Sequence, residues 1–106
     1  MKLYIAVLDD FPDYMTPTLV AHSMLSAHLL FQNEPIYQTW LTDSFKKCVV
    51  RVNRKEFAKI SQLTVHLGHE NNTLNGEKSC AVVLPCPDWE IPNVLKFAKL
   101  WKPKGA

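Results

Sequence analysis

The sequence lacks the patterns that mark disulfide-bonded, zinc-binding and membrane-spanning proteins. It has three cysteines, Cys48, Cys80 and Cys86, and no Cys-x-x-Cys pair, so neither a disulfide framework nor a zinc site is expected. The apolar run at 3–8 is too short for a signal peptide or a bilayer span. We therefore expect a cytoplasmic protein with no metal, no cofactor and no membrane partner.

A strong excess of charge of one sign is also missing. The chain has 12 basic and 10 acidic residues, a formal net charge of +2, which is too balanced for a protein dedicated to binding nucleic acid. What the sequence does have is 47% hydrophobic residues in a chain of 106, enough to build a core without disulfides or metals. We expect one domain covering residues 1–106.

Apolar runs and helix signals alternate along the chain. Thr16 followed by Pro17 has the hydroxyl and the proline that often begin a helix, and Asn53 and Asp88 are capping residues of the same kind. Residues 36–47 contain aromatic side chains but show no clear period. The predicted strands are 3–8, 48–52, 63–67 and 79–85, and the predicted helices are 17–31, 54–61 and 89–101.

This order of elements predicts an α/β fold. Two strand–helix–strand units imply parallel strands with helices on both faces, and the short connection between the last two strands implies an antiparallel pair. We expect a three-layer α/β/α domain with a four-stranded mixed sheet. In the last helix, Trp89 and Trp101 are interpreted as covering the core.

The predicted first helix raises a question about function, because histidines and serines stand among its apolar residues. His22, Ser23 and Ser26 cluster in its N-terminal half, while the helix is apolar around most of its circumference, so much of it should be buried. The ordinary interpretation is a set of hydroxyls bonded to their own helix beside a solvent-facing histidine. The alternative is a polar window facing a ligand, because anions bind where a helix begins after the first strand of such a sheet.

Two segments carry a resemblance to a known family. Residues 7–24, V-L-D-D-F-P-D-Y-M-T-P-T-L-V-A-H-S-M, are similar to a strand ending in Arg-x-Asp-Leu, a methionine, and Gly-Lys-x-Ala-Ala-Gln-x-x-His-Ala. Residues 76–85, G-E-K-S-C-A-V-V-L-P, are similar to Gly-Thr-x-Thr-x-x-x-x-Gly-Pro. Both patterns belong to the type 2 peptidyl-tRNA hydrolase superfamily. Trp40, the chain length and the order of elements also fit, so the resemblance extends over nearly the whole chain.

The sequence departs from the family pattern at the residues that the family uses for hydrolysis. Leu8 replaces the arginine, and Leu19 replaces the helix lysine that is implicated in catalysis. The family's glutamine and histidine fall on Ser23 and Ser26, and its Asp-Ala-Gly-Arg-Thr-Gln signature falls within 67–73, where no aspartate stands. The positions that match the family are Asp10, Phe11 and Met15.

A better fit is an uncharacterised bacterial branch of this superfamily. Its pattern Asp-Leu-x-x-Trp-x-x-x-Asn-Val-x-Ala resembles D-F-P-D-Y-M-T-P-T-L-V-A at 10–21, and its Gly-His-Asp/Glu loop resembles Gly68-His69-Glu70. That branch implies no particular activity.

Loss of the lysine predicts weak or absent hydrolase activity and favours a non-catalytic binding protein. The expected ligand is phosphorylated: a nucleotide, a nucleotide signal or an RNA end such as that of tRNA, held where the first helix begins. Such a small protein would act by sequestering its ligand, as some phage-encoded counter-defence proteins do. The predicted ligand-binding residues are Asp10, Tyr14, Thr16, Thr18, His22, Ser23, Ser26, His69, Glu70 and Asn71.

Two other functions stay open on the sequence. A divergent peptidyl-tRNA hydrolase would use His22, His69 and Glu70 to activate a water molecule, with Lys78 approaching from the opposite strand. A protein–protein interaction module would use the last helix, and the family resemblance implies a homodimer. The ordinary interpretation of His69 is a solvated loop residue.

Overall fold

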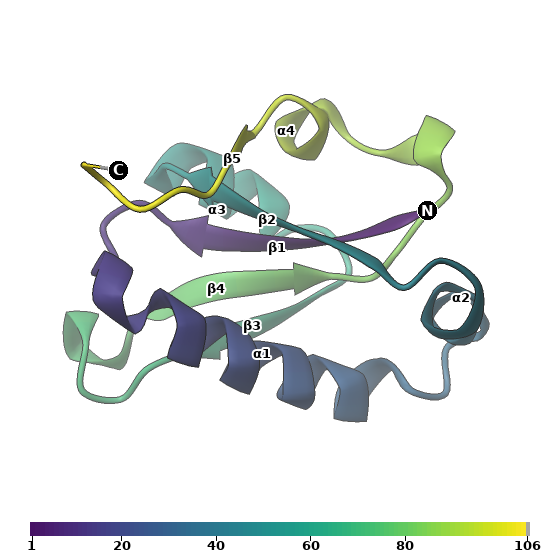
Figure 1. Cartoon of the computed structure of the whole chain (residues 1–106), viewed down its shortest axis with the longest axis horizontal. Helices are drawn as coiled ribbons and strands as arrows, with labels where there is room; N and C mark the ends of the chain where they lie inside the picture. The colour runs from purple at the N-terminus through teal and green to yellow at the C-terminus, as the bar shows by residue number, and fades with distance from the viewer. Residues whose placement is uncertain (106) are drawn as a thin grey trace.

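The computed structural model describes residues 1–105 and has a five-stranded sheet with helices on both faces (Figure 1). The strand order is β3-β4-β1-β2-β5. The strands are β1 (Lys2–Leu8), β2 (Lys46–Val52), β3 (Val65–His69), β4 (Lys78–Val83) and β5 (Lys99–Leu100), and the α-helices are α1 (Thr16–Phe31), α2 (Pro35–Thr39), α3 (Arg54–Ile60) and α4 (Asn93–Lys96).

The sheet is mixed, as the order of elements predicts. β1 pairs in parallel with β2, whereas β4 is antiparallel to both β1 and β3. The parallel pair is joined through α1, and the antiparallel β3–β4 pair follows α3. The α/β class and the mixed sheet are confirmed, but the expected number of four strands is wrong because β5 adds a fifth.

The extra strand comes from the segment that the sequence predicts as a last helix. Instead of one helix over 89–101, a short 3-10 turn at Asp88–Glu90 is followed by the single turn of α4. Pro92 has φ −61° and ψ 148°, an extended conformation that separates the two turns. Lys99 and Leu100 then pair with β2, which gains hydrogen-bonded neighbours on both sides.

The two tryptophans of this segment have different environments. Trp101 packs against the core beside β2, as expected, and the Arg51 guanidinium lies 5.1 Å from its ring centroid. Trp89 is 85% exposed, so the interpretation that it covers the core is wrong. Its place in the isolated 3-10 turn, rather than on a long helix against the sheet, explains the difference.

Helix α1 buries a narrow stripe rather than most of its surface. The outward-facing Leu25, Leu29 and Leu30 are 66%, 63% and 60% exposed, so the expectation of extensive burial is wrong. The sheet covers one face of the helix only, and its buried residues follow a spacing of three or four. They are Thr16, Leu19, Ser23, Ala27 and Phe31.

The predicted capping residue is confirmed at the start of α3 but not at the start of α1. Asn53 caps α3 as expected: its side chain accepts from the Glu56 backbone N–H, and the Glu56 carboxylate accepts from the Asn53 N–H. Thr16 does not cap α1, because a 3-10 turn at Asp13–Met15 leads directly into the helix and makes Thr16 its first residue. The Thr16 hydroxyl is buried without a hydrogen-bond partner.

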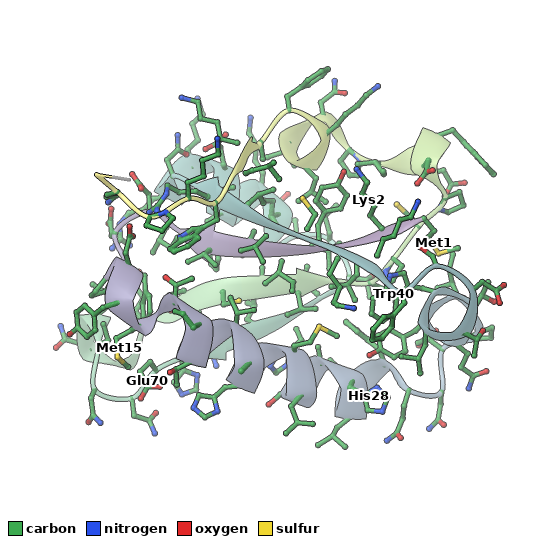
Figure 2. All side chains as sticks on the ribbon, viewed as in Figure 1. Met1, Lys2, Met15, His28, Trp40 and Glu70 are labelled. Atoms are coloured by element: carbon green, nitrogen blue, oxygen red, sulfur yellow. The ribbon has the colours of Figure 1, made fainter. Side chains whose placement is uncertain are left out.

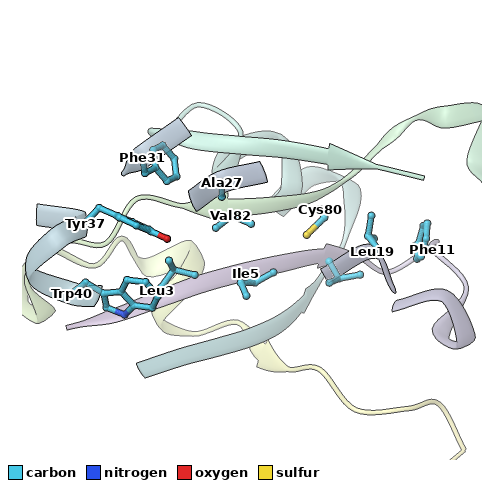
Figure 3. Packing of buried hydrophobic residues seen from close by; sticks show 11 residues of the cluster. Leu3, Ile5, Phe11, Leu19, Ala27, Phe31, Tyr37, Trp40, Cys80 and Val82 are labelled. Carbon is cyan, nitrogen blue, oxygen red and sulfur yellow. The ribbon is translucent and has the colours of Figure 1, made fainter. Parts of the chain in front are cut away.

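Two hydrophobic clusters hold the three layers together. One lies between the sheet and α1 with α2, and Figure 3 shows its side chains, among them Ile5, Phe31 and Trp40. The other lies between the opposite face and α3 with α4, and includes Phe57 and Leu95. Buried strand β1 contributes alternate residues to both clusters. Within residues 1–105, no helix has the length and apolar character needed to cross a bilayer.

Arg51 ties the segment after β5 to the loop after β1. Its guanidinium donates to Asp13 at 3.0 and 3.1 Å, to Asp9 at 3.3 Å and to the Lys102 carbonyl at 2.5 Å. The Lys104 backbone N–H also donates to Asp13, at 2.6 Å. The two groups that donate to Asp13, first the Arg51 guanidinium and then the Lys104 backbone N–H, hold the pKa of Asp13 below its ordinary value.

Asp13 should therefore contribute to the acid sensitivity of the fold. Because its pKa in the folded chain lies below the ordinary value of 3.8, its ion pair stabilises the fold above that value, and the stabilisation is lost as the pH falls through the folded pKa. Urea unfolding across this range should show the loss in the wild type and a flatter profile for Asp13→Asn. The exposed control Asp43→Asn should keep the wild-type profile, and an unchanged Asp13→Asn profile would contradict the assignment.

Candidate functional site

A polar pocket of about 170 Å³ lies between α1 and the β3–β4 pair. Most of its lining side chains carry imidazole, hydroxyl or ammonium groups. The lining residues are His22, Ser23 and Ser26 of α1, His66, Leu67, Gly68 and His69 of β3, and Lys78 of β4.

The depth of this pocket depends on a close approach between α1 and β3. A Cβ atom on Gly68 would lie 2.0 Å from Ser23 Oγ and 2.9 Å from Ser23 Cβ, so only glycine fits there. Next to this contact, the pairing of β3 with β4 shifts register between Gly68 and His69. The irregularity pairs His69 with Lys78 and brings both side chains to the pocket.

Lys78 determines which nitrogen of His69 is free to donate. Lys78 Nζ lies 3.1 Å from His69 Nδ1. The ammonium has only donors, so His69 Nδ1 accepts and Nε2 carries the hydrogen. The pair therefore presents an N–H group from each side chain to a ligand.

His66 adds a neutral imidazole to the pocket. Partial burial, and after it the positive charge of Lys78, lower the pKa of His66 from its ordinary value of 6.5. At neutral pH this ring is uncharged, with one nitrogen that donates and one that accepts.

One carboxylate stands at the edge of the pocket. Glu70 follows β3 and lies beside the N-terminal half of α1, as Figure 2 shows. Its Oε2 is 4.0 Å from His22 Nε2, so the two form an ion pair when His22 is protonated. His22 is itself largely exposed and lines the pocket from the helix side.

Ser23 has a buried hydroxyl whose hydrogen-bond capacity is unfilled. Its Oγ has no well-formed hydrogen bond among the described residues, and its polar neighbour is the Cys80 thiol, whose pKa the Ser23 hydroxyl lowers slightly against the effect of burial. The ordinary interpretation, a hydroxyl bonded to its own helix, is therefore wrong for Ser23. Burial raises the pKa of Cys80 to about 11, so this thiol stays protonated and takes no part in the chemistry of the pocket.

The structure brings together half of the predicted site residues. His22, Ser23, Ser26 and His69 line the pocket and Glu70 lies at its edge, which joins the helix window to the later loop as the ligand hypothesis requires. The other predicted residues lie outside the pocket. These are Asp10, Tyr14, Thr16, Thr18 and Asn71.

Each residue outside the pocket has an identifiable environment. Asp10 accepts from Arg54 Nε at 2.6 Å, and Arg54 also binds Glu77, so the Asp10 carboxylate is occupied by a structural ion pair. Tyr14 is exposed and Thr16 is buried in the helix stripe. Thr18 and Asn71 are exposed side chains away from the lining.

His66 lines the pocket but is not among the predicted site residues. The alternation of side chains between the two faces of the predicted strand could have identified it. Val65 and Leu67 pack in the cluster under α3, so His66 between them faces α1 together with Gly68. The same alternation places Lys78 on the face of Cys80 and Val82, which belong to the cluster under α1.

Within residues 1–105, no three His, Cys, Asp or Glu side chains come together as a metal-binding group. The pocket residues offer hydrogen-bond donors, one positive charge and imidazoles that can transfer protons.

No protein-family model matches the sequence, and no curated protein matches it at a significant level.

Proposed function

We propose that the protein binds a phosphorylated ligand, with the phosphate group in the pocket between α1 and β3–β4. The observation that carries this proposal is the convergence of three imidazoles and one ammonium on a single small pocket. Within residues 1–105, Glu70 is the one carboxylate that pairs with a residue of the lining. The number of hydrogen-bond donors and the Lys78 ammonium favour an anionic ligand.

The pocket residues can supply the hydrogen bonds that a phosphate group accepts. Lys78 gives one of its three donors to His69 and has two left. His69 offers its Nε2–H and Ser26 an exposed hydroxyl from the helix. Hydrogen bonds from an ammonium to a phosphate oxygen are charge-assisted and about twice as strong as neutral ones.

The size of the pocket limits which part of the ligand it holds. A volume of about 170 Å³ is below the range of about 300–1,000 Å³ typical of sites that enclose a whole small molecule. The pocket suits a phosphate group whose nucleoside or RNA chain lies outside. With its phosphate group in this pocket, the proposed ligand lies beside the first half of α1 rather than at the helix terminus.

The position of Leu19 supports binding over hydrolysis. Leu19 stands where the hydrolase family that the sequence resembles has a lysine, and here its side chain is fully buried in the cluster under α1. A charged group at this position would have to be buried among apolar residues, which is strongly unfavourable. The cation of the pocket comes from Lys78 on the sheet instead.

Binding of the phosphate group can be measured by isothermal titration with a 5′-phosphorylated dinucleotide, using its 5′-hydroxyl form as the ligand control. We expect Lys78→Met to weaken binding about 10- to 100-fold, the effect of losing a charge-assisted hydrogen bond of about 1.5–3 kcal/mol. Lys59→Met, an exposed lysine on α3, should bind as the wild type does. Equal binding of the two dinucleotides would contradict the proposal.

A divergent peptidyl-tRNA hydrolase is the second candidate. The proximity of His22 and Glu70, at 4.0 Å, favours it, because a carboxylate beside an imidazole is a pairing used for general bases. Release of the amino acid from an N-acetylated aminoacyl-tRNA tests it, with His22→Ala and His69→Ala as controls. The binding proposal predicts no release above background, and release that both substitutions abolish would establish the enzyme.

A further inference from the structure

A second pocket, of about 380 Å³, lies at the other end of α1, where the helix faces the segment between α2 and β2. We call it the aromatic groove. Figure 2 shows its labelled residues His28 and Trp40 on the two sides of this junction. The lining residues are Ala21, Met24, Leu25 and His28 of α1 and Tyr37, Trp40, Leu41, Phe45 and Lys47 of the segment leading into β2.

Three packed aromatic rings form the inner wall of the aromatic groove. Trp40 lies between Tyr37 and Phe45, with ring centroids 5.2 and 5.6 Å away, and the Phe45 ring is within 29° of parallel to it. The polar edge of this wall is satisfied internally, because Trp40 Nε1 donates to the Lys46 carbonyl at 2.8 Å. The Tyr37 hydroxyl is 3.0 Å from His28 Nδ1. The polar groups of this wall are therefore already paired, and an apolar molecule that covers the groove leaves none of them without a partner.

The backbone at Phe45 is held in an unusual conformation that shapes the groove. Residues Trp40–Ser44 form a π-helical turn, and Phe45 ends it with φ 57° and ψ 9°, in the left-handed region. A bulky residue rarely adopts this region, and such conformations and π-turns gather at ligand sites. Here the conformation places a largely exposed phenyl ring over Trp40 as one side of the groove.

Lys47 is the single formally charged residue of the lining. Its Nζ lies 3.1 Å from the Phe45 ring centroid and 5.3 Å from that of Trp40. It donates to the Phe45 carbonyl at 2.7 Å, which leaves two donors for another partner. An occupant with an anionic group beside its apolar body would pair with this ammonium.

We propose that the aromatic groove binds a small aromatic anion, with its ring system packed on the exposed Phe45 ring beside Leu25 and its carboxylate paired with Lys47. This site is separate from the phosphate pocket, since the two share no lining residue. Its volume lies within the range of small-molecule sites. The protein would then carry two ligand sites along one helix.

The test is isothermal titration of the full chain with 2-naphthoate, and with neutral 2-naphthalenemethanol as the matched ligand. The wild type should bind the anion more tightly than the alcohol. Lys47→Met should weaken naphthoate binding about tenfold, as expected for loss of one charge-assisted contact, and leave the alcohol unchanged.

A pair of substitutions on α1 locates the binding site. Leu25→Glu places a carboxylate on the groove wall and should abolish naphthoate binding. Leu30→Glu, an equally exposed position of the same helix outside the lining, should leave it unchanged. Equal affinity for the two ligands, no detectable binding of naphthoate, or equal effects of the two glutamates would each overturn the proposal.

Discussion

Replacing Gly68 by alanine is expected to destabilise the fold by about 3 kcal/mol, the upper part of the range for overpacking a close-packed interior. The added carbon would lie 2.0 Å from Ser23 Oγ and 2.9 Å from Ser23 Cβ. Rotation about χ1 of Ser23 can relieve the Oγ contact, but the Cβ contact is relieved only if α1 moves away from β3, and Ser23 is buried between them. The free energy of unfolding, measured by urea denaturation, gives the effect directly.

A second substitution tests the cause of this loss. Ser23→Gly removes both clashing atoms, so adding it to Gly68→Ala should restore most of the stability, less about 1 kcal/mol that glycine costs inside a helix. Ser23→Ala removes only the hydroxyl and should restore less. If Gly68→Ala alone changes the free energy of unfolding by under about 0.5 kcal/mol, the close approach of α1 to β3 is wrong.

Replacing Trp40 by alanine should destabilise the protein by about 3–5 kcal/mol, the usual cost of removing a large aromatic side chain from a core. Trp40 is only 1% exposed and donates to the Lys46 carbonyl, so the substitution leaves both a cavity and an unpaired carbonyl. Thermal unfolding followed by circular dichroism measures the change.

Trp89 supplies a matched control for this prediction. It is the same residue type but 85% exposed, so Trp89→Ala should alter stability by less than about 0.5 kcal/mol. Trp40→Phe should fall between the two, because phenylalanine refills part of the cavity but cannot donate to Lys46. Similar losses for Trp40→Ala and Trp89→Ala would contradict the packing described for both.

Local signals in the sequence predict most of the elements. The apolar run of β1 and the capping pair Asn53 and Glu56 identify their elements without reference to the rest of the chain. The segment after Pro92 could not be predicted in this way. Its strand β5 exists because Lys99 and Leu100 pair with β2, a contact that no local pattern encodes.

Part of the candidate site likewise follows from local sequence signals, and the rest depends on tertiary contacts. The window of His22, Ser23 and Ser26 follows from helical spacing, and the loop with His69 and Glu70 stands out by composition. The pocket itself depends on the Gly68 contact and on the register of β3 with β4, which are tertiary features. The ion pair that occupies Asp10 is also a tertiary feature, because its partner Arg54 lies on α3 and no local pattern joins the two residues.

The proposed phosphate site lies among the histidines between α1 and β3. The chain has four histidines, of which His22, His66 and His69 line the pocket while His28 lies outside it, bonded to Tyr37. The most direct measurement is an NMR titration of the imidazole resonances with a 5′-phosphorylated dinucleotide. Binding in the pocket should cause saturable shifts in the resonances of the three pocket histidines and none in that of His28. The phosphate site is contradicted if no imidazole resonance moves, or if all four move alike.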